Sequence, residues 1–336
     1  MSGPSVWLWA TDCFGPAKIA PFRCVKGGLW LSETGMTISK THRQGIDLAR
    51  FIAAFGVVVA HVEASPVDWV GHVALALFAL LTAFLAVKSA ERAGGAYAYG
   101  PRVQRLLVPW LVWSVFYWTV EAAIADGPDK FRPLTDPWSL LYGGAIHLWF
   151  LPFIGLAMGL VGPAVSYVTT PGRLTGAAIL LVGISAPLFW AHEALNLPQP
   201  MPQWAFTLPC YALGLLLAKA QGMGRAGIAR ATGVTLAALA VWMGQAAPWT
   251  FTVLAGLLAF ELFWRLPAQG RWAVHLGQVA FGIYLIHPFM MLVLYKFTPQ
   301  LTAPELPVLL PAGLDFLISW AIVVVLRRLP AFARVT

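Results

Sequence analysis

The sequence predicts an all-α, polytopic membrane protein with about ten transmembrane helices and both termini in the cytoplasm. Hydrophobic residues make up 59% of the 336 residues and charged residues only 11%, whereas soluble globular domains contain about 25% charged residues. The mean hydropathy is +0.73. The 16 tryptophans and 25 prolines suit the interfacial aromatic belts and interrupted helices that are common in membrane folds.

The net charge of +8 does not indicate a nucleic-acid partner, because the basic residues fall in connections between apolar segments and form no continuous stripe. Cys13, Cys24 and Cys210 are scattered and lack the spacing of a metal site or a disulfide framework. We therefore expect membrane lipids as the surroundings, and neither a metal nor a nucleic acid as a ligand.

Residues 1–44 show little periodic hydrophobic pattern. They lack the continuous apolar core, of about 7–15 residues, that a signal peptide requires. Because Met36 lies just ahead of the first apolar segment, we expect translation to begin there and the upstream residues to reflect a misassigned start. Residues 45–336 are expected to form one transmembrane domain.

Ten apolar segments approach the length of about 20 residues that a helix needs to cross a bilayer. Pro152, Pro209 and Pro288 fall within three of these segments and predict kinked or broken helices there. In chain order the segments are 46–63, 71–87, 106–125, 146–168, 174–191, 203–218, 228–245, 248–264, 276–295 and 306–326.

Lysine and arginine residues concentrate in alternate connections. Thirteen lie in the even-numbered connections and the C-terminal tail, and three lie in the odd-numbered connections. Lys40 and Arg43 precede the first segment. Since cytoplasmic connections carry the excess of basic residues, this alternation places both termini in the cytoplasm, as an even number of spans requires.

The first apolar segment carries three polar side chains along one side of the expected helix. Arg50 and His61 are eleven residues apart, which corresponds to about 20° in azimuth and about 16 Å along the axis. Asp47 precedes Arg50 by three residues, a spacing that allows an ion pair. Arg50 alone could be a flanking residue that extends to the interface, and His61 alone could satisfy a backbone carbonyl. Their shared face favours a polar pathway or cavity.

Arg102 and Arg105 lie one helical turn apart at the start of the third segment. As a structural feature they are ordinary basic flanks on the cytoplasmic side. As a functional feature they could bind phosphate groups, because guanidinium groups contact phosphate oxygens in a bidentate manner.

Two further histidines are candidates for chemistry in the outer half of the membrane. His147 opens the fourth segment, where an interfacial aromatic residue would also be ordinary. His287 follows Tyr284 by one turn and precedes Pro288, so it could instead satisfy a carbonyl that the proline leaves free. Asp315 lies within the last segment without an evident role.

These residues together resemble the acyltransferase type 3 family, bacterial membrane enzymes that O-acylate surface glycans. The second segment departs from the family pattern, since it closes with Thr82-Ala83-Phe84 in place of Ser-Gly-Phe, and Leu48-Ala49 stands where Gly is frequent between the Asp and Arg. No esterase-like domain follows the last segment, as expected for a stand-alone member. The resemblance rests on Ile46-Asp47-Leu48-Ala49-Arg50 followed after ten residues by His61, on 78–84, on Arg102-x-x-Arg105-Leu-Leu-Val-Pro109, on His147-Leu-Trp-Phe-Leu151 and on Gly282-Ile-Tyr-Leu-Ile-His287.

The resemblance implies transfer of an acyl group from cytoplasmic acyl-CoA, usually acetyl-CoA, to a sugar hydroxyl of a glycan or lipid-linked glycan at the outer face of the bacterial inner membrane. It implies donor binding by Arg50, Arg102 and Arg105. The residues that it implies for catalysis are Asp47, Arg50, His61, His147, Tyr284 and His287. Two other classes remain open: a proton-coupled transporter, which would also place ionisable groups inside helices, and a non-catalytic component of glycan export.

Overall fold

A computed structural model describes residues 43–63, 65–95, 97–125, 136–268, 270–303, 306–330, 332 and 335. The expected start at Met36, and nearly all of the segment 1–44, lie outside these residues. Every regular element in the described part of the chain is a helix. The predicted all-α fold is therefore confirmed.

The helices follow one another with short connections. In chain order they are α1 (Gly45–His61), α2 (Trp69–Arg92), α3 (Tyr99–Ile124), α5 (Ser139–Tyr142), η2 (Ile146–Trp149), α6 (Phe150–Ala157), η3 (Met158–Leu160), α7 (Val161–Tyr167), α8 (Pro171–Ala194), α9 (Met201–Gly222), α10 (Ala226–Met243), η4 (Pro248–Phe251), α11 (Thr252–Arg265), α12 (Arg271–Phe297), η5 (Pro299–Thr302) and α13 (Leu309–Leu326).

Each of the ten predicted segments coincides with a helix or a run of helices. Eight spans in the described residues are long and apolar enough to cross a membrane: α2, α3, the run Ile146–Tyr167, α8, α9, α10, α12 and α13. The other two, α1 with 17 residues and α11 with 14, are shorter. The chain is thus a multi-pass membrane protein, whereas the count of ten and the orientation stay predictions.

The prolines do not break the helices in which they lie. α9 and α12 continue through Pro209 and Pro288, and α6 continues through Pro152. The fourth predicted span is nevertheless interrupted, since it begins as the 3-10 turn η2 and narrows again at η3. The fourth span is therefore interrupted as predicted, next to Pro152, whereas the helices at Pro209 and Pro288 are not broken, and kinks at these two prolines stay predictions.

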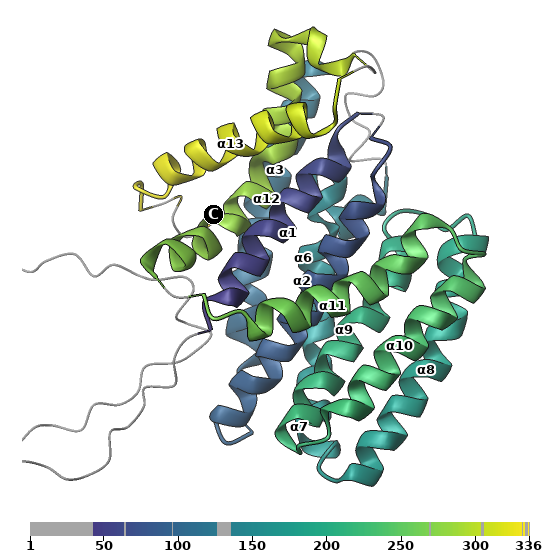
Figure 1. The fold of residues 1–336 in the computed structure, drawn as a ribbon. Coiled ribbons are helices and arrows are strands. Elements are labelled where there is room, and N and C mark those ends of the chain that lie inside the picture. The colour runs from purple at the N-terminus through teal and green to yellow at the C-terminus, as the bar shows by residue number, and fades with distance from the viewer. Residues whose placement is uncertain are drawn as a thin grey trace, which may run out of the picture.

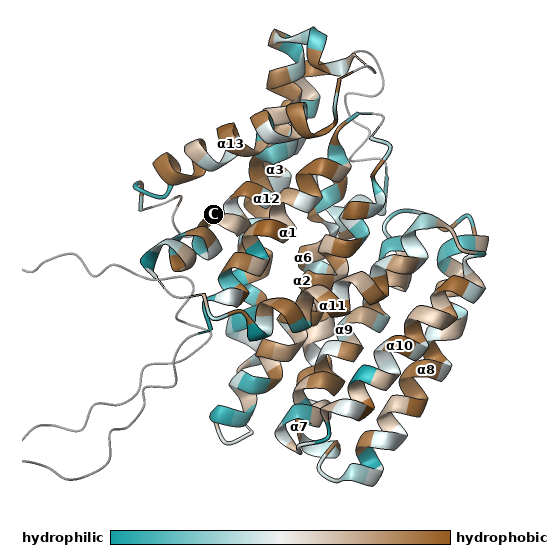
Figure 2. Cartoon of the chain, viewed as in Figure 1, coloured by the Kyte–Doolittle hydropathy of each residue, from teal (hydrophilic) through white to brown (hydrophobic). Residues whose placement is uncertain are grey.

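The helices form two packed groups that meet at α1, α2 and α6 (Figure 1). One hydrophobic cluster includes residues of α2, α8, α9, α10 and α11, and the other includes residues of α1, α3, α12 and α13. In Figure 2 the helices are mainly hydrophobic along their lengths, with hydrophilic residues gathered near their ends and in the connections. This distribution is the one expected of helices surrounded by lipid.

Small residues let α1 and α2 pack closely. A Cβ added to Gly56 of α1 would lie 3.2 Å from the Ala74 Cβ, and one added to Gly71 of α2 would lie 2.6 Å from the Ala60 Cβ. Since residues late in α1 contact residues early in α2, the two helices are antiparallel. The end of α1 and the start of α2 therefore lie at the same level of the protein.

Candidate functional site

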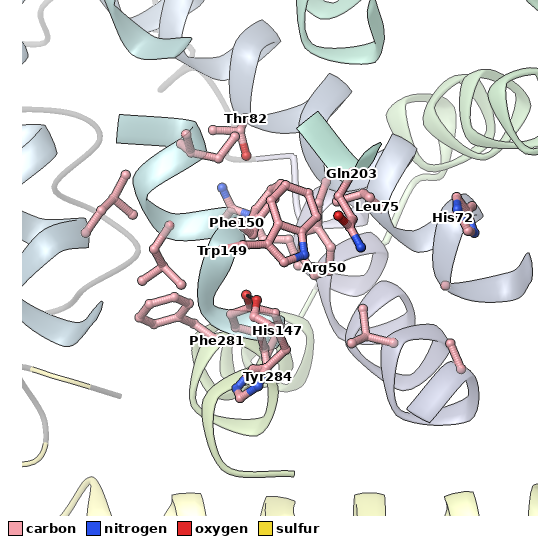
Figure 3. A pocket seen from close by; sticks show the side chains of 18 of the residues that line it. Arg50, His72, Leu75, Thr82, His147, Trp149, Phe150, Gln203, Phe281 and Tyr284 are labelled. Atoms are coloured by element: carbon pink, nitrogen blue, oxygen red, sulfur yellow. Dashed lines mark hydrogen bonds between the residues drawn. The ribbon is translucent and has the colours of Figure 1, made fainter. Parts of the chain in front are cut away.

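A cavity of about 620 Å³ lies where the two helix groups meet. It is a size typical of small-molecule sites. Its walls come from α1, α2, α3, η2, α6 and α12, with single residues from the turn before α2 and from η3, α8 and α9. Figure 3 shows polar and aromatic side chains from these elements around it. The polar or aromatic side chains that line it and matter below are Arg50, His61, Asp68, His72, Arg102, Arg105, His147, Trp149, His192, Gln203 and Tyr284.

Three arginines line one end of this cavity, which we call the arginine end: Arg50, Arg102 and Arg105. Sequence reasoning had selected all three as donor-binding residues, and the structure brings them to one cavity from two different helices. They supply a concentrated set of guanidinium donors of the kind that bind phosphate groups.

The ion pair expected within α1 is present at the arginine end. Asp47 is fully buried, and its Oδ1 lies 3.6 Å from Nη1 of Arg50. Gly277 of α12 packs directly on this aspartate, since an added Cβ there would lie 2.5 Å from the Asp47 Cβ. Burial of the carboxylate beside the guanidinium holds Arg50 toward the cavity, and the lack of a side chain at Gly277 makes the room.

Arg102 is held in place by two neighbours. Its Nη2 donates a hydrogen bond of 2.8 Å to the Ser89 hydroxyl of α2, and its guanidinium lies 4.8 Å from the centre of the Tyr97 ring. Stacking and hydrogen bonding both restrict a side chain that is otherwise highly mobile. Arg102 is therefore positioned rather than free, as a phosphate-binding residue should be.

Three histidines from three separate elements meet at the far end of α1. The ring centroids of His61 and His287 are 5.0 Å apart, those of His147 and His287 are 5.5 Å apart, and those of His61 and His147 are 6.4 Å apart. His61 and His147 line the cavity, whereas His287 is fully buried behind them. We call these residues the histidine cluster.

His61 has one ring nitrogen that can act as a hydrogen-bond acceptor. Its Nδ1 lies 2.8 Å from the Val57 carbonyl oxygen, so Nδ1 must carry the hydrogen. In the neutral ring Nε2 is then an acceptor. Its side chain is exposed and lines the cavity, which suits a general base.

His287 has a structural explanation as well as a place in the cluster. Pro288 has no N–H group, so the carbonyl of Tyr284, four residues earlier, loses its helical donor. His287 Nδ1 donates to that carbonyl at 2.9 Å. The sequence had left open that His287 satisfies a carbonyl freed by the proline, and this hydrogen bond does so. The Nε2 of His287 is nevertheless buried without a hydrogen-bond partner among the described residues.

Two tyrosines hold His147 against α12. The Tyr284 hydroxyl donates to the His147 carbonyl, and Tyr117 places its ring 5.2 Å from the His147 ring while its hydroxyl donates to the Leu285 carbonyl at 2.7 Å. The Tyr284 hydrogen is thus engaged with the backbone. Tyr117 was missed in the sequence, where nothing distinguishes it from other aromatic residues in a transmembrane helix.

A second pair of histidines, also missed, lines the cavity further along. The rings of His72 in α2 and His192 in α8 are 5.8 Å apart, and Gln203 of α9 joins them in the wall. A histidine at the start of the apolar segment 71–87 was a signal that could have drawn attention to His72. Among the described residues, no group of three His, Cys, Asp or Glu side chains is arranged to hold a metal ion.

Comparison with known proteins agrees with the resemblance seen in the sequence. The family model described as "Acyltransferase domain", of the type 3 acyltransferases, matches residues 43–326. No curated protein and no solved structure matches the chain. The match covers most of the sequence, from just before α1 to the end of α13, and with it every residue placed in the cavity above. The chain belongs to the acyltransferase type 3 family.

Proposed function

We propose that this protein is a membrane O-acyltransferase that moves an acyl group, with acetyl as the first candidate, from cytoplasmic acyl-CoA to a sugar hydroxyl of an exported or surface glycan. The observation that carries the proposal is a single cavity lined by three arginines at one end and by His61 and His147 beyond them. Family membership supports an acyltransferase, and the cavity supports a donor with an anionic group at a distance from its reactive carbon.

The length of α1 suits such a donor. Arg50 and His61 are separated by eleven residues of continuous helix, or about 16 Å along the axis. A donor whose phosphates contact Arg50, Arg102 and Arg105 needs a long arm to bring its thioester to His61. Coenzyme A has such an arm between its phosphates and its sulfur. Three guanidinium groups at one end also favour a polyanionic donor over a neutral one.

The proposed reaction is direct transfer with His61 as general base. Nε2 of His61 accepts the proton of the acceptor hydroxyl while the hydroxyl oxygen attacks the thioester carbonyl carbon. The new C–O bond forms, the tetrahedral intermediate collapses, the C–S bond breaks, and the proton passes from His61 to the departing thiolate. The products are the O-acyl ester and free CoA, so atoms and charge balance. A route through an acyl-histidine would use the same atoms in two steps.

The developing oxyanion requires hydrogen-bond donors. Tyr284 is unsuited in this conformation, because its hydroxyl already donates to the His147 carbonyl. Trp149 lines the cavity beside His147, and its indole N–H can only donate. His147, whose Nε2 is buried without a partner among the described residues, can contribute only in the tautomer that carries the hydrogen on Nε2. We assign Trp149 and His147 as the candidate donors.

Sealed vesicles from bacterial inner membranes test the proposal. With the cytoplasmic face outward, added radiolabelled acetyl-CoA should label glycan or lipid-linked glycan inside the lumen only when this chain is present. Labelling confined to acceptor on the donor side would contradict transfer across the membrane. Accumulation of unmodified substrate in the lumen would instead identify a transporter. Equal glycan acetylation in cells with and without the chain would favour a non-catalytic export component.

A further inference from the structure

The cavity does not end at the histidine cluster. Beside it, toward α8 and α9, lies a region that we call the second chamber, lined by Asp68, His72, His192 and Gln203. It belongs to the same cavity but comes from α2, α8 and α9 and from the turn before α2. Neither the family resemblance nor the proposed donor site gives these four residues a role.

The length of α2 gives the distance between the arginine end and the second chamber. Arg102 bonds to Ser89 near the end of α2, and His72 lies near its start. The 17 residues between these positions correspond to about 26 Å along the helix. His72 follows Gly71, which packs on Ala60 next to His61. The second chamber is therefore level with the end of α1 and remote from the arginines.

Aromatic side chains pack against the two histidines of the second chamber. The His72 ring lies 5.1 Å from the Phe206 ring, and the His192 ring lies 4.6 Å from the Trp249 ring. Phe206 follows Gln203 by three residues in α9, which brings Gln203 to the same level. His192 Nδ1 donates to the Pro202 carbonyl at 2.8 Å. These contacts hold both imidazoles in defined orientations.

The available polar atoms of the second chamber include three hydrogen-bond acceptors. His192 uses Nδ1–H on a carbonyl, so its Nε2 accepts in the neutral ring. Gln203 Oε1 is buried without a hydrogen-bond partner among the described residues, and the Asp68 carboxylate also accepts. A buried acceptor without a partner is unfavourable, by an amount that a ligand O–H group can recover. Anionic groups require hydrogen-bond donors, and the arginine end supplies such donors.

We propose that the second chamber binds the acceptor and selects an uncharged, hydroxyl-rich ring over an anionic one. The inference rests on the proposed function and adds the residues and the charge preference of its acceptor site. Sugar hydroxyls donate to His192 Nε2, Gln203 Oε1, Asp68 and the acceptor nitrogen of the His72 ring, while a carboxylate or phosphate on the ring would face the Asp68 carboxylate. The reacting hydroxyl then points from the second chamber toward His61.

The test measures sugar binding without any acyl donor. The full chain in lipid nanodiscs is titrated with methyl glycosides of glucose, galactose, mannose and N-acetylglucosamine, and with the uronic acid forms of the first three, followed by NMR. At least one neutral glycoside should bind more tightly than its uronic acid form. Gln203→Met removes an acceptor without breaking a protein hydrogen bond through that atom, and His72→Phe keeps an aromatic ring. Each should weaken neutral binding by about three- to tenfold.

As matched controls, the same types of substitution are made at positions outside the cavity. Gln221→Met lies in the same helix as Gln203, and His275→Phe lies on α12, and neither position lines the cavity. Both should bind the glycosides like the unaltered chain. Two results would overturn the proposal: no saturable binding of any neutral glycoside, or unchanged binding in both Gln203→Met and His72→Phe. A preference for the uronic acid form in every pair would also overturn it.

The same samples separate this inference from the proposed function. Acetyl-CoA binding and acetyl transfer are measured in parallel. If neutral sugars bind as expected but no acetyl transfer occurs, the second chamber is supported as a sugar site and the proposed acyltransferase function is refuted. If acetyl transfer occurs but no neutral sugar binds, the proposed acyltransferase function is supported and the second chamber is not its acceptor site.

Discussion

Replacement of His61 by alanine separates catalysis from folding. Among the described residues the imidazole makes one hydrogen bond, from Nδ1 to the Val57 carbonyl at the end of α1, and its loss should lower the free energy of unfolding by about 1 kcal/mol. The side chain is exposed, so little apolar surface is uncovered. A general base contributes about 10²–10⁴-fold to the rate, which at about 1.36 kcal/mol per tenfold is roughly 2.7–5.4 kcal/mol of barrier. Activity should therefore fall far more than stability.

The assay is acetyl transfer from radiolabelled acetyl-CoA in inverted membrane vesicles, with the amount of inserted chain measured by immunoblot. For His61→Ala we expect kcat to fall by about 10²–10⁴, with KM for acetyl-CoA close to that of the unaltered chain. His275→Ala is the matched control, because His275 is exposed on α12 and does not line the cavity. Near-normal turnover in His61→Ala would remove this residue from the mechanism. An equal loss in His275→Ala would show that the assay reports something other than the site.

The other predictions concern the arginine end. Arg50→Lys should raise KM for acetyl-CoA, because an ammonium group cannot reproduce bidentate geometry; full activity would reduce Arg50 to a flanking charge. Arg102→Ala and Arg105→Ala should raise KM with kcat little changed, the signature of lost uniform binding, and a fall in kcat alone would count against phosphate binding. Gly277→Ala should also raise KM, since its Cβ would lie 2.5 Å from the side chain that pairs with Arg50. Gly176→Ala is the control, because a Cβ there meets nothing within 4 Å, and equal KM values would contradict the packing argument.

Features within a single helix could be read from the sequence. The shared face of Arg50 and His61, and the pairing of Asp47 with Arg50, follow from the constant rotation and rise per residue. The positions of the apolar segments follow from the length that a bilayer requires. In each case the decisive geometry lies inside one continuous segment, so no knowledge of neighbouring helices is needed.

Contacts between helices could not be read in the same way. The sequence gives the azimuth of a residue on its own helix but not the helix that packs against that face. Tyr117 contacts His147 across 30 residues, and His72 contacts His192 across 120 residues. His287 shows a related limit, because its neighbour Pro288 made a structural role equally consistent with the sequence, and the hydrogen bond to the Tyr284 carbonyl reveals that role.

The distribution of donors and acceptors along the cavity bears on which class of protein this is. A proton-coupled transporter binds its substrate and the coupling ion at neighbouring positions of one site, which it exposes to each side in turn, so the same groups contact the same substrate throughout. Here the cationic donors of Arg50, Arg102 and Arg105 gather at one end of the cavity, and acceptors such as Gln203 Oε1 lie at the other. Such a cavity matches two chemically different ligands better than one. With His61 level with the second chamber and its Nε2 able to accept a proton, the arrangement favours a reaction between two bound substrates over passage of a single one.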